Sequence, residues 1–294
     1  MTKLKYILIS LRPKHWMKNG FIFIPLIFVG LFFDKLSLLK VLQTFFIFCL
    51  AASSVYLLND ILDKEKDKKH PIKNQRPIAA GKVPVIFALF LSLVLLAIAL
   101  YWAFYLDKGL ILFIIGYYLI NILYSIWLKN LFLLDVFIVA LNYLIRVYSG
   151  AYIIKVEVSS WLFLIIFLFA LVVSFGKRKE ELGLLNEEAK NHRESLNYYS
   201  SAMLNQMIII GSTLTIISYI LYTVSPDTVL KHGPFLVYTT PLVIFGFFRY
   251  LYLVSEKNMG SPVEVVLKDK ILFLTVVLWL VVISFLIYFS NLIF

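Results

Sequence analysis

Charged residues are scarce in this sequence. Asp, Glu, Lys and Arg make up 15% of its 294 residues, whereas hydrophobic residues make up 61% and the mean hydropathy is +0.89. Soluble globular domains contain about 25% charged residues. The composition therefore excludes an ordinary soluble protein and favours one that lies in a membrane.

Cysteine and clustered histidine are also lacking. The single cysteine, Cys49, excludes an intrachain disulfide and a cluster of thiolate metal ligands. The four histidines stand far apart in the chain, at His15, His70, His192 and His232. Because zinc sites need such ligands at close spacing, we expect no zinc in this protein.

Long apolar runs are abundant. Each run has about 18 residues or more, which is long enough for a helix to cross a bilayer. The expected helices cover residues 16–33, 38–58, 84–106, 109–128, 131–153, 159–176, 201–224, 234–255 and 271–292. The short connections between them leave no room for a separate soluble domain. We therefore predict an all-α, polytopic membrane protein with about nine transmembrane helices, in a single domain over residues 1–294.

The basic residues are distributed asymmetrically. With nine spans, most of them fall on the side of the N-terminus and of the connections at 59–83, 129–130, 177–200 and 256–270. The other side holds five lysines, Lys35, Lys40, Lys108, Lys155 and Lys231. Since positively charged loops stay in the cytoplasm, we predict that the first side is cytoplasmic. The net charge of +11 is thus mostly an effect of topology, and we expect no nucleic acid as a partner.

The segment NDILDKEKD, residues 59–67, carries acidic residues in register. On a helix that continues from the second span, Asn59, Asp60, Asp63 and Asp67 fall within an arc of about 100°. Three carboxylates in one stripe are stabilised by a cation, and Mg²⁺ prefers such oxygen ligands together with phosphate oxygens. The alternative is a solvated helix end whose acids pair with neighbouring lysines. We favour the metal because Asn59 still lies within the apolar run.

A basic turn follows this segment in HPIKNQRPIAAG, residues 70–81. Pro71 and Pro77 end the helix and make the turn rigid. Lys73 and Arg76 are thereby held next to the carboxylates, where cations can bind phosphate oxygens that a metal leaves uncovered. Anchoring of a cytoplasmic loop is the alternative explanation for each of them.

Another charged cluster, SFGKRKEEL, follows the sixth apolar run. Lys177 and Arg178 come directly after the apolar residues, and Glu181 stands four positions after Lys177. The cluster is either a charged helix end with an internal salt bridge or a phosphate clamp with an orienting carboxylate. We favour the clamp.

Two more segments add basic and aromatic side chains on the same side. LRPKHWMKN places Lys14 and Lys18 near the N-terminus, and LYSIWLKN places Tyr124 shortly before Lys129. Anchoring at the membrane interface is the alternative to substrate binding for both segments.

Together these segments resemble the UbiA superfamily of intramembrane transferases. NDILDKEKD matches the family's first motif, N-D-x-x-D-x-x-x-D, at Asn59, Asp60, Asp63 and Asp67. The usual second motif, D-x-x-x-D after the sixth span, is replaced here by GKRKEEL. The resemblance implies helices around a central cavity, open at the cytoplasmic rim, in which Mg²⁺ and a diphosphate bind.

The departure in the second motif is similar to one branch of that superfamily, the decaprenyl-phosphate phosphoribosyltransferases. Segments similar to that branch include RPKHWMKN, YSIWLK, KRKEEL, HRESLNYY and GSPVEVVLKD. The resemblance implies transfer of 5-phosphoribose from 5-phosphoribosyl diphosphate (PRPP) to a polyprenyl phosphate in the cell membrane, with release of diphosphate. Lys177 and Arg178 would suit the additional 5′-phosphate of this donor.

The predicted site combines metal-binding and substrate-binding residues. Asp60, Asp63 and Asp67 are expected to be catalytic, and with Asn59 they are expected to hold Mg²⁺. The residues expected to bind substrate are Asn59, Lys14, Lys18, Lys73, Arg76, Tyr124, Lys129, Lys177, Arg178 and Glu181. No general base is required, because a phosphomonoester acceptor with a second pKa of about 6 is mostly ionised at pH 7.

Two other functions stay open. A UbiA-type prenyltransferase would move a prenyl group from a prenyl diphosphate to an aromatic or other acceptor, and the missing second aspartate motif argues against it. A transporter would place its charges at mid-membrane, whereas nearly all of them lie on one rim here. Inside the spans, Arg146 is expected to have a structural partner near Ser149 and Gly150, and Asp135 to orient Lys129 or to cap its helix.

Overall fold

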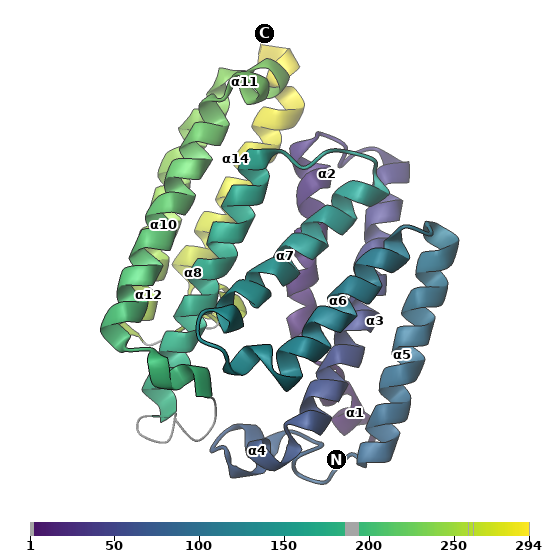
Figure 1. Ribbon diagram of the computed structural model, residues 1–294. Helices are drawn as coiled ribbons and strands as arrows, with labels where there is room; N and C mark the ends of the chain where they lie inside the picture. The colour runs from purple at the N-terminus through teal and green to yellow at the C-terminus, as the bar shows by residue number, and fades with distance from the viewer. Residues whose placement is uncertain (1–2, 186–193, 258, 261, 294) are drawn as a thin grey trace. The chain divides into compact units, whose positions relative to one another are not determined.

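The structure is a computed structural model that describes residues 3–185, 194–257, 259–260 and 262–293 (Figure 1). Contacts between residues group the chain into two compact units. Unit 1 comprises Met1–Leu26, Asp34–Ile138 and Ile145–Val156, and unit 2 comprises Ile27–Phe33, Val139–Leu144 and Glu157–Phe294. Helix α7, Leu134–Ile153, therefore contributes residues to both units.

Helices make up the regular secondary structure of the described residues. Seven of them are long and apolar enough to cross a membrane, and α6, Leu110–Ile126, is apolar but shorter. Backbone N–H and C=O groups find no water in the hydrocarbon core of a bilayer, and a helix satisfies them within one segment. The predicted all-α, polytopic membrane architecture is thus confirmed, while the count of nine helices and the central cavity stay predictions.

Unit 1 is built around helix α3, Lys35–Leu62. Its most apolar window is 61% buried inside the protein, against 17% for α5, Val85–Leu106, so α3 is a core helix and α5 exposes most of its apolar surface. Helix α3 also packs against α1, Lys3–Leu11, against the 3₁₀ helix η1, Pro13–Phe23, and against α6. Helix α3 is therefore central to unit 1, and its last turn carries the start of the acidic segment.

Two serines join α3 to α5. Ser54 Oγ lies 2.8 Å from the backbone oxygen of Ser92 and 2.9 Å from its hydroxyl, and Ser92 Oγ lies 3.0 Å from the backbone oxygen of Ser54. Both serines are fully buried. Since lipid supplies no hydrophobic drive for helices to associate, close packing and hydrogen bonds between small side chains hold such an interface together.

The first expected helix is interrupted. The sequence predicts one helix over residues 16–33, but the structure has η1 up to Phe23 and then a short helix α2, Ile24–Phe28. Pro25 explains the break, because proline lacks the N–H that a continuous helix needs and its ring clashes with the preceding turn. In the first turn of α2 the same proline is tolerated.

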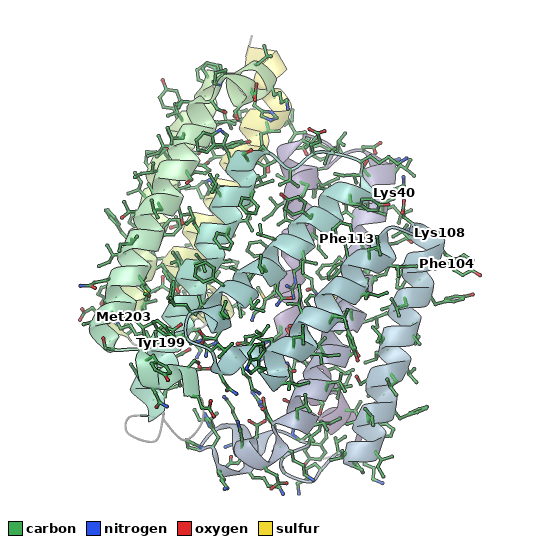
Figure 2. The ribbon with its side chains drawn as sticks, in the orientation of Figure 1. Lys40, Phe104, Lys108, Phe113, Tyr199 and Met203 are labelled. Carbon is green, nitrogen blue, oxygen red and sulfur yellow. The ribbon has the colours of Figure 1, made fainter. Side chains whose placement is uncertain are left out.

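Short elements mark one end of unit 1, and lysines mark the other. Helix α4, Lys64–Lys69, lies at the same end as α1 and the N-terminus in Figure 1. The 3₁₀ helices η2, Lys73–Gln75, and η3, Leu128–Asn130, contact α4 and α6, respectively. Figure 2 shows Lys40 and Lys108 at the opposite end, where α3 begins and α5 ends. This separation agrees with the predicted division of the basic residues between the two sides.

Unit 2 is a bundle of long helices with short elements at its ends. Its elements are α8 Ser160–Leu185, η5 Glu194–Tyr198, α10 Ser201–Val224, α11 Pro226–His232, η6 Pro234–Thr239, α12 Thr240–Glu256, α13 Pro262–Lys268 and α14 Lys270–Ile293. Helix α10 packs against α8 and α12, and α12 packs against α14 (Figure 1). Helix α8 runs past its expected end at residue 176, so the basic segment after it is helical.

A bidentate ion pair ties α12 to the start of α14. Arg249 donates from Nε to Asp269 Oδ1 at 3.2 Å and from Nη2 to Asp269 Oδ2 at 2.7 Å, and Asp269 Oδ1 also accepts from the Leu272 N–H at 2.7 Å. These hydrogen bonds favour the ionised carboxylate and hold the pKa of Asp269 below its ordinary value.

We expect this ion pair to make stability depend on pH on the acid side. The contribution of a carboxylate with a lowered pKa is complete above the pKa of the unfolded chain, about 3.9, and is lost as the pH falls through the lower folded-state pKa. Asp269→Asn should therefore lower the thermal unfolding temperature at pH 7 and flatten its decline below about pH 4. The exposed Glu157→Gln is the control. An unchanged profile in Asp269→Asn would contradict this prediction.

Candidate functional site

The acidic segment begins in the last turn of α3 and continues into α4. Asp63 lies between the two helices with φ −91° and ψ 2°, so the prediction of one unbroken helix through residue 67 is wrong. Aspartate is a weak helix former in an interior position because its carboxylate competes for backbone groups. The hydrogen bonds Asp63 N–H to Asn59 O (2.9 Å) and Asp67 N–H to Asp63 O (2.7 Å) nevertheless carry the chain through the junction.

The basic turn is fixed by an apolar cluster beneath it. Ile78 and Val83 from the turn are buried against Leu57 of α3 and Ala88 of α5. Arg76 is held at the start of this stretch, where its N–H bonds Lys73 O (3.0 Å) and its carbonyl accepts from the Ala80 N–H (2.8 Å). The predicted rigid turn is therefore present, and it fixes the backbone from which Arg76 projects.

Arg76 joins two of the predicted metal ligands. Its Nη1 atom donates to Asp60 Oδ1 at 3.1 Å and to Asp67 Oδ2 at 2.7 Å. The Asp60 side chain is 2% exposed and that of Asp67 is 6% exposed. Because a buried ionised carboxylate is very costly without a partner, this guanidinium is needed to keep both aspartates charged.

Arg12 contacts the acidic segment, although the sequence did not point to it as a metal-binding or substrate-binding residue. Its Nη2 donates to Asp60 Oδ1, and its guanidinium lies 5.2 Å from the centre of the Tyr56 ring. Its backbone adopts φ 52°, in the left-handed region, between α1 and η1. The sequence offered two signals: a basic residue directly before Pro13 at the end of an apolar stretch, and its place in the segment RPKHWMKN.

The segment that carries Arg12 is bonded to α3. Trp16 Nε1 donates to Ser53 Oγ at 3.0 Å, and Ser53 Oγ lies 3.0 Å from the backbone oxygen of Leu11. The Arg12 carbonyl accepts from the His15 N–H at 2.9 Å. The backbone of Arg12 is thus fixed relative to Asp60.

The other two residues of the first motif bond to η3 and α6. Lys129 Nζ lies 2.6 Å from Asp63 Oδ1. Ser125 donates from Oγ to Asn59 Oδ1, and Ser125 is buried next to Tyr124, which is half-buried. The structure therefore brings Lys129, which was predicted to bind substrate, against an aspartate of the first motif that is far from it in sequence.

Burial also affects the acidic segment electrostatically. It raises the pKa of the Asp67 carboxyl above the ordinary value for an aspartate, and the guanidinium of Arg76 opposes this rise. Lys73, half-buried in η2, acts on Asp67 in the same direction as Arg76. From the N-terminal segment, Lys14 is exposed, Lys18 is half-buried, and Arg12 contacts Asp60.

The chemistry of this site fits a divalent cation. Two carboxylate oxygens, from Asp60 and Asp67, converge on a single cationic atom, Nη1 of Arg76. Among the described residues, no three His, Cys, Asp or Glu side chains come together as a ready ligand set. Mg²⁺ is usually held by only one or two carboxylates together with substrate phosphates and water, so two converging aspartates suffice.

The second charged cluster lies in unit 2, on the last turns of α8. Arg178 is buried and forms an ion pair with Glu181. Lys177 is half-buried on the same helix. His192 and the start of the HRESLNYY segment lie outside the described residues. Tyr199, the last residue of that segment and labelled in Figure 2, packs edge to face on Phe175, with the two ring centres 6.5 Å apart.

A close backbone contact positions this cluster. A Cβ atom built on Gly260 would lie 2.0 Å from the carbonyl oxygen of Gly176, and one built on Gly176 would lie 2.2 Å from the Tyr250 hydroxyl. Only glycine permits such an approach. Gly260 therefore lies directly against α8 at the point where the basic residues of this helix begin.

The charged residues inside α7 have structural surroundings. Arg146 is buried and donates from Nε to Asn19 Oδ1 at 2.8 Å and from Nη2 to the Tyr117 hydroxyl at 3.1 Å. The expected structural pairing of Arg146 is therefore present, and its side-chain partners are Asn19 and Tyr117. Of the two residues near which a partner was expected, Ser149 donates to the Arg146 carbonyl, and Gly150 lets α7 approach the Ile22 backbone. Asp135 is buried in the first turn of α7.

Solved structures share this fold. A UbiA homolog from Archaeoglobus fulgidus bound to GPP and Mg²⁺ matches with a TM-score of 0.69 at 18% sequence identity, over 96% of this chain and 99% of that chain. At this identity the likeness shows the fold alone. Among the described residues, seven helices are long and apolar enough to cross a membrane, and together with this fold they define an integral membrane protein. The sequence pattern of the UbiA prenyltransferase family matches residues 23–276, and the chain belongs to that family.

Named relatives extend over almost the whole chain. It is similar to the decaprenyl-phosphate phosphoribosyltransferase of Mycolicibacterium smegmatis, at 32% identity over 96% of this chain and 92% of the relative. The protein of the same name from Corynebacterium glutamicum is 30% identical over 92% of this chain and 83% of the relative. The similarity to these relatives therefore covers both charged clusters.

We expect Gly176→Ala to disturb the second cluster, with Gly183→Ala as a control on the same helix. The added methyl group at 176 meets the Tyr250 hydroxyl, whereas a Cβ at 183 has no atom within 4 Å. Overpacking should destabilise Gly176→Ala by about 1–3 kcal/mol, while Gly183→Ala should be neutral or stabilising by up to about 1 kcal/mol. Thermal unfolding of the purified protein measures both. Tyr250→Phe should restore part of the loss; equal behaviour of the two alanine variants would refute the contact.

Proposed function

We propose that this protein transfers 5-phosphoribose from PRPP to a polyprenyl phosphate. The anomeric C1–O bond to diphosphate breaks, a new bond forms between C1 and an oxygen of the acceptor phosphate, and diphosphate leaves. The observation that carries the proposal is the combination of the aspartate segment with a basic α8 segment in place of a second aspartate motif. The similarity to two enzymes named decaprenyl-phosphate phosphoribosyltransferase supports it.

The aspartates would hold the metal that accompanies the diphosphate. Asp60 and Asp67 converge on one cation, and Asp63 and Asn59 lie beside them in the first motif. Bound Mg²⁺ would stabilise negative charge on the departing diphosphate. Solved structures of UbiA homologs bound to Mg²⁺ support the use of this metal.

The basic residues would bind the phosphates. Arg76 and Lys73 project from the fixed turn next to the carboxylates, and Lys129 lies on Asp63. In unit 2, Lys177 and Arg178 would bind the 5′-phosphate, with Glu181 orienting Arg178. Arginine is suited to this role because its planar donors match phosphate oxygens.

The acceptor needs no general base from the protein. A phosphomonoester with a second pKa of about 6 is mostly a dianion at neutral pH, so its oxygen is already nucleophilic. The exposed apolar sides of helices such as α5 would accommodate its polyprenyl tail. We further propose that the protein lies in the plasma membrane with its N-terminus and the acidic segment in the cytoplasm, because most basic residues lie on that side.

Prenyl transfer to another acceptor is the second candidate. It is favoured by the structure of a UbiA homolog that is bound to GPP. The basic α8 segment argues against it, because a prenyl diphosphate carries no additional phosphate for Lys177 and Arg178. The two candidates differ in the donor that the enzyme consumes.

The first test is a donor panel with and without a chelator. Purified protein should move label from PRPP to a polyprenyl phosphate, and EDTA should abolish the transfer. Asp67→Asn should lower kcat by about 100-fold, since loss of metal stabilisation of the transition state costs several kcal/mol. Glu65→Gln is the matched control on α4, because Glu65 pairs with Lys68 at the exposed surface. Full activity in EDTA, or consumption of a prenyl diphosphate instead of PRPP, would disprove the proposal.

The second test concerns the 5′-phosphate. Lys177→Gln should raise KM for PRPP about tenfold and leave kcat within about twofold, because a charged hydrogen bond present in both ground state and transition state contributes about 1.5–3 kcal/mol. The exposed Lys257→Gln, at the end of α12, is the control. Unchanged KM in Lys177→Gln would remove this residue from the substrate site.

A further inference from the structure

The carboxylates of the first motif are already neutralised by arginines of the same chain. Arg12 and Arg76 both donate to one oxygen, Asp60 Oδ1, and Arg76 also donates to Asp67 Oδ2. The Asp60 side chain is 2% exposed, whereas those of Arg12 and Arg76 are 19% and 27% exposed. The two guanidinium groups therefore cover the buried carboxylate on its more exposed side.

Both arginines and a divalent cation cannot use these oxygens together. An Oδ1 atom that accepts from two guanidinium groups has no lone pair left for a metal. A cation bound to the other oxygen of Asp60 would still lie within a few ångströms of two positive groups and be repelled by them. Mg²⁺ also requires short oxygen contacts in near-octahedral geometry, which leaves little freedom to avoid this conflict.

We propose that Arg12 is an exchangeable counter-ion: it holds Asp60 while the metal is absent and moves to a diphosphate oxygen when metal and diphosphate bind. The identity of the diphosphate rests on the proposed function. Charge is balanced in both states, because the divalent cation takes over the carboxylates and the guanidinium takes over part of the negative charge that the diphosphate brings. Planar guanidinium donors fit carboxylate and phosphate equally well.

Arg12 is better placed to move than Arg76. Arg76 contacts two carboxylates and projects from a turn whose Ile78 is packed against Leu57. Arg12, in contrast, contacts Asp60 alone among the aspartates of the motif. The backbone around Arg12 is fixed by the bonds of Trp16 and Ser53, so a rotation of its side chain is sufficient. The guanidinium carbon lies 5.2 Å from the centre of the Tyr56 ring, so the face of this ring supports the cation in addition to Asp60.

The exchange predicts opposite effects on metal and on diphosphate. Full-length protein in lipid nanodiscs is titrated with Mn²⁺ alone, and bound metal is measured by electron paramagnetic resonance. Arg12→Gln should bind Mn²⁺ about tenfold more tightly than wild type, because a charged competitor for Asp60 is gone. With Mn²⁺ saturating, the same variant should bind inorganic diphosphate about tenfold more weakly. Arg249→Gln, which removes a comparable arginine from unit 2, should change neither affinity.

A purely structural role for Arg12 gives a different result. If Arg12 only stabilises the fold, Arg12→Gln should bind Mn²⁺ no more tightly than wild type, and that outcome overturns the proposal, as does absence of Mn²⁺ binding to both proteins. Arg12→Lys keeps the charge but not the planar fork, so it should bind Mn²⁺ like wild type and diphosphate more weakly.

Thermal unfolding serves as the control that Arg12→Gln is folded. Ligands that bind only the folded state raise its unfolding temperature, and at a given ligand concentration the increase is larger when the affinity is higher. Arg12→Gln should unfold earlier than wild type in EDTA, and Mn²⁺ should raise its unfolding temperature by more than that of wild type; an equal or smaller increase overturns the exchange. The metal titrations contain no PRPP, so failure of PRPP transfer with an intact Mn²⁺ effect would reject the proposed reaction and retain the exchange.

Discussion

The contact between Arg76 and the two aspartates is the constraint on which the rest of the site depends. Asp60 lies in the last turn of an apolar helix and is almost inaccessible to water, so its charge is tolerated only beside a fixed cation. Arg76 provides that cation because the turn behind it is packed on the apolar cluster of Leu57, Ile78 and Val83. The apolar core of unit 1 thus determines where charge can lie at the membrane rim.

Much of the fold follows from the sequence, because a bilayer permits few alternatives. Apolar runs of sufficient length must become helices, and eight of the predicted runs are found as helical segments among the described residues. The first run is broken at Pro25. The prediction of one helix there rested on the length of the apolar run and did not take into account that proline has no backbone N–H. The junction at Asp63 was not predicted either, because a change in the backbone angles of one residue leaves no trace in the spacing of side chains.

The candidate site was predictable as far as its residues share one segment. The motif at residues 59–67 and the turn up to Arg76 could be read directly, because local spacing determines which side chains are neighbours. Arg12 reaches Asp60 from 48 positions away, and Lys129 reaches Asp63 from 66 positions away. Such contacts depend on how helices pack, and periodicity carries no information about them. In unit 2, similarly, the ion pair between Arg178 and Glu181 was not singled out by the spacing of the charged residues.

Because one guanidinium nitrogen serves both Asp60 and Asp67, these three positions cannot vary independently. Loss of Arg76 would leave two carboxylates with too little positive charge, while loss of one aspartate would leave the guanidinium with a single partner. A substitution at one position is therefore tolerated only on a background in which the others have already changed. Divergence within this triad should be rare and concerted, with the three residues retained or replaced as one unit.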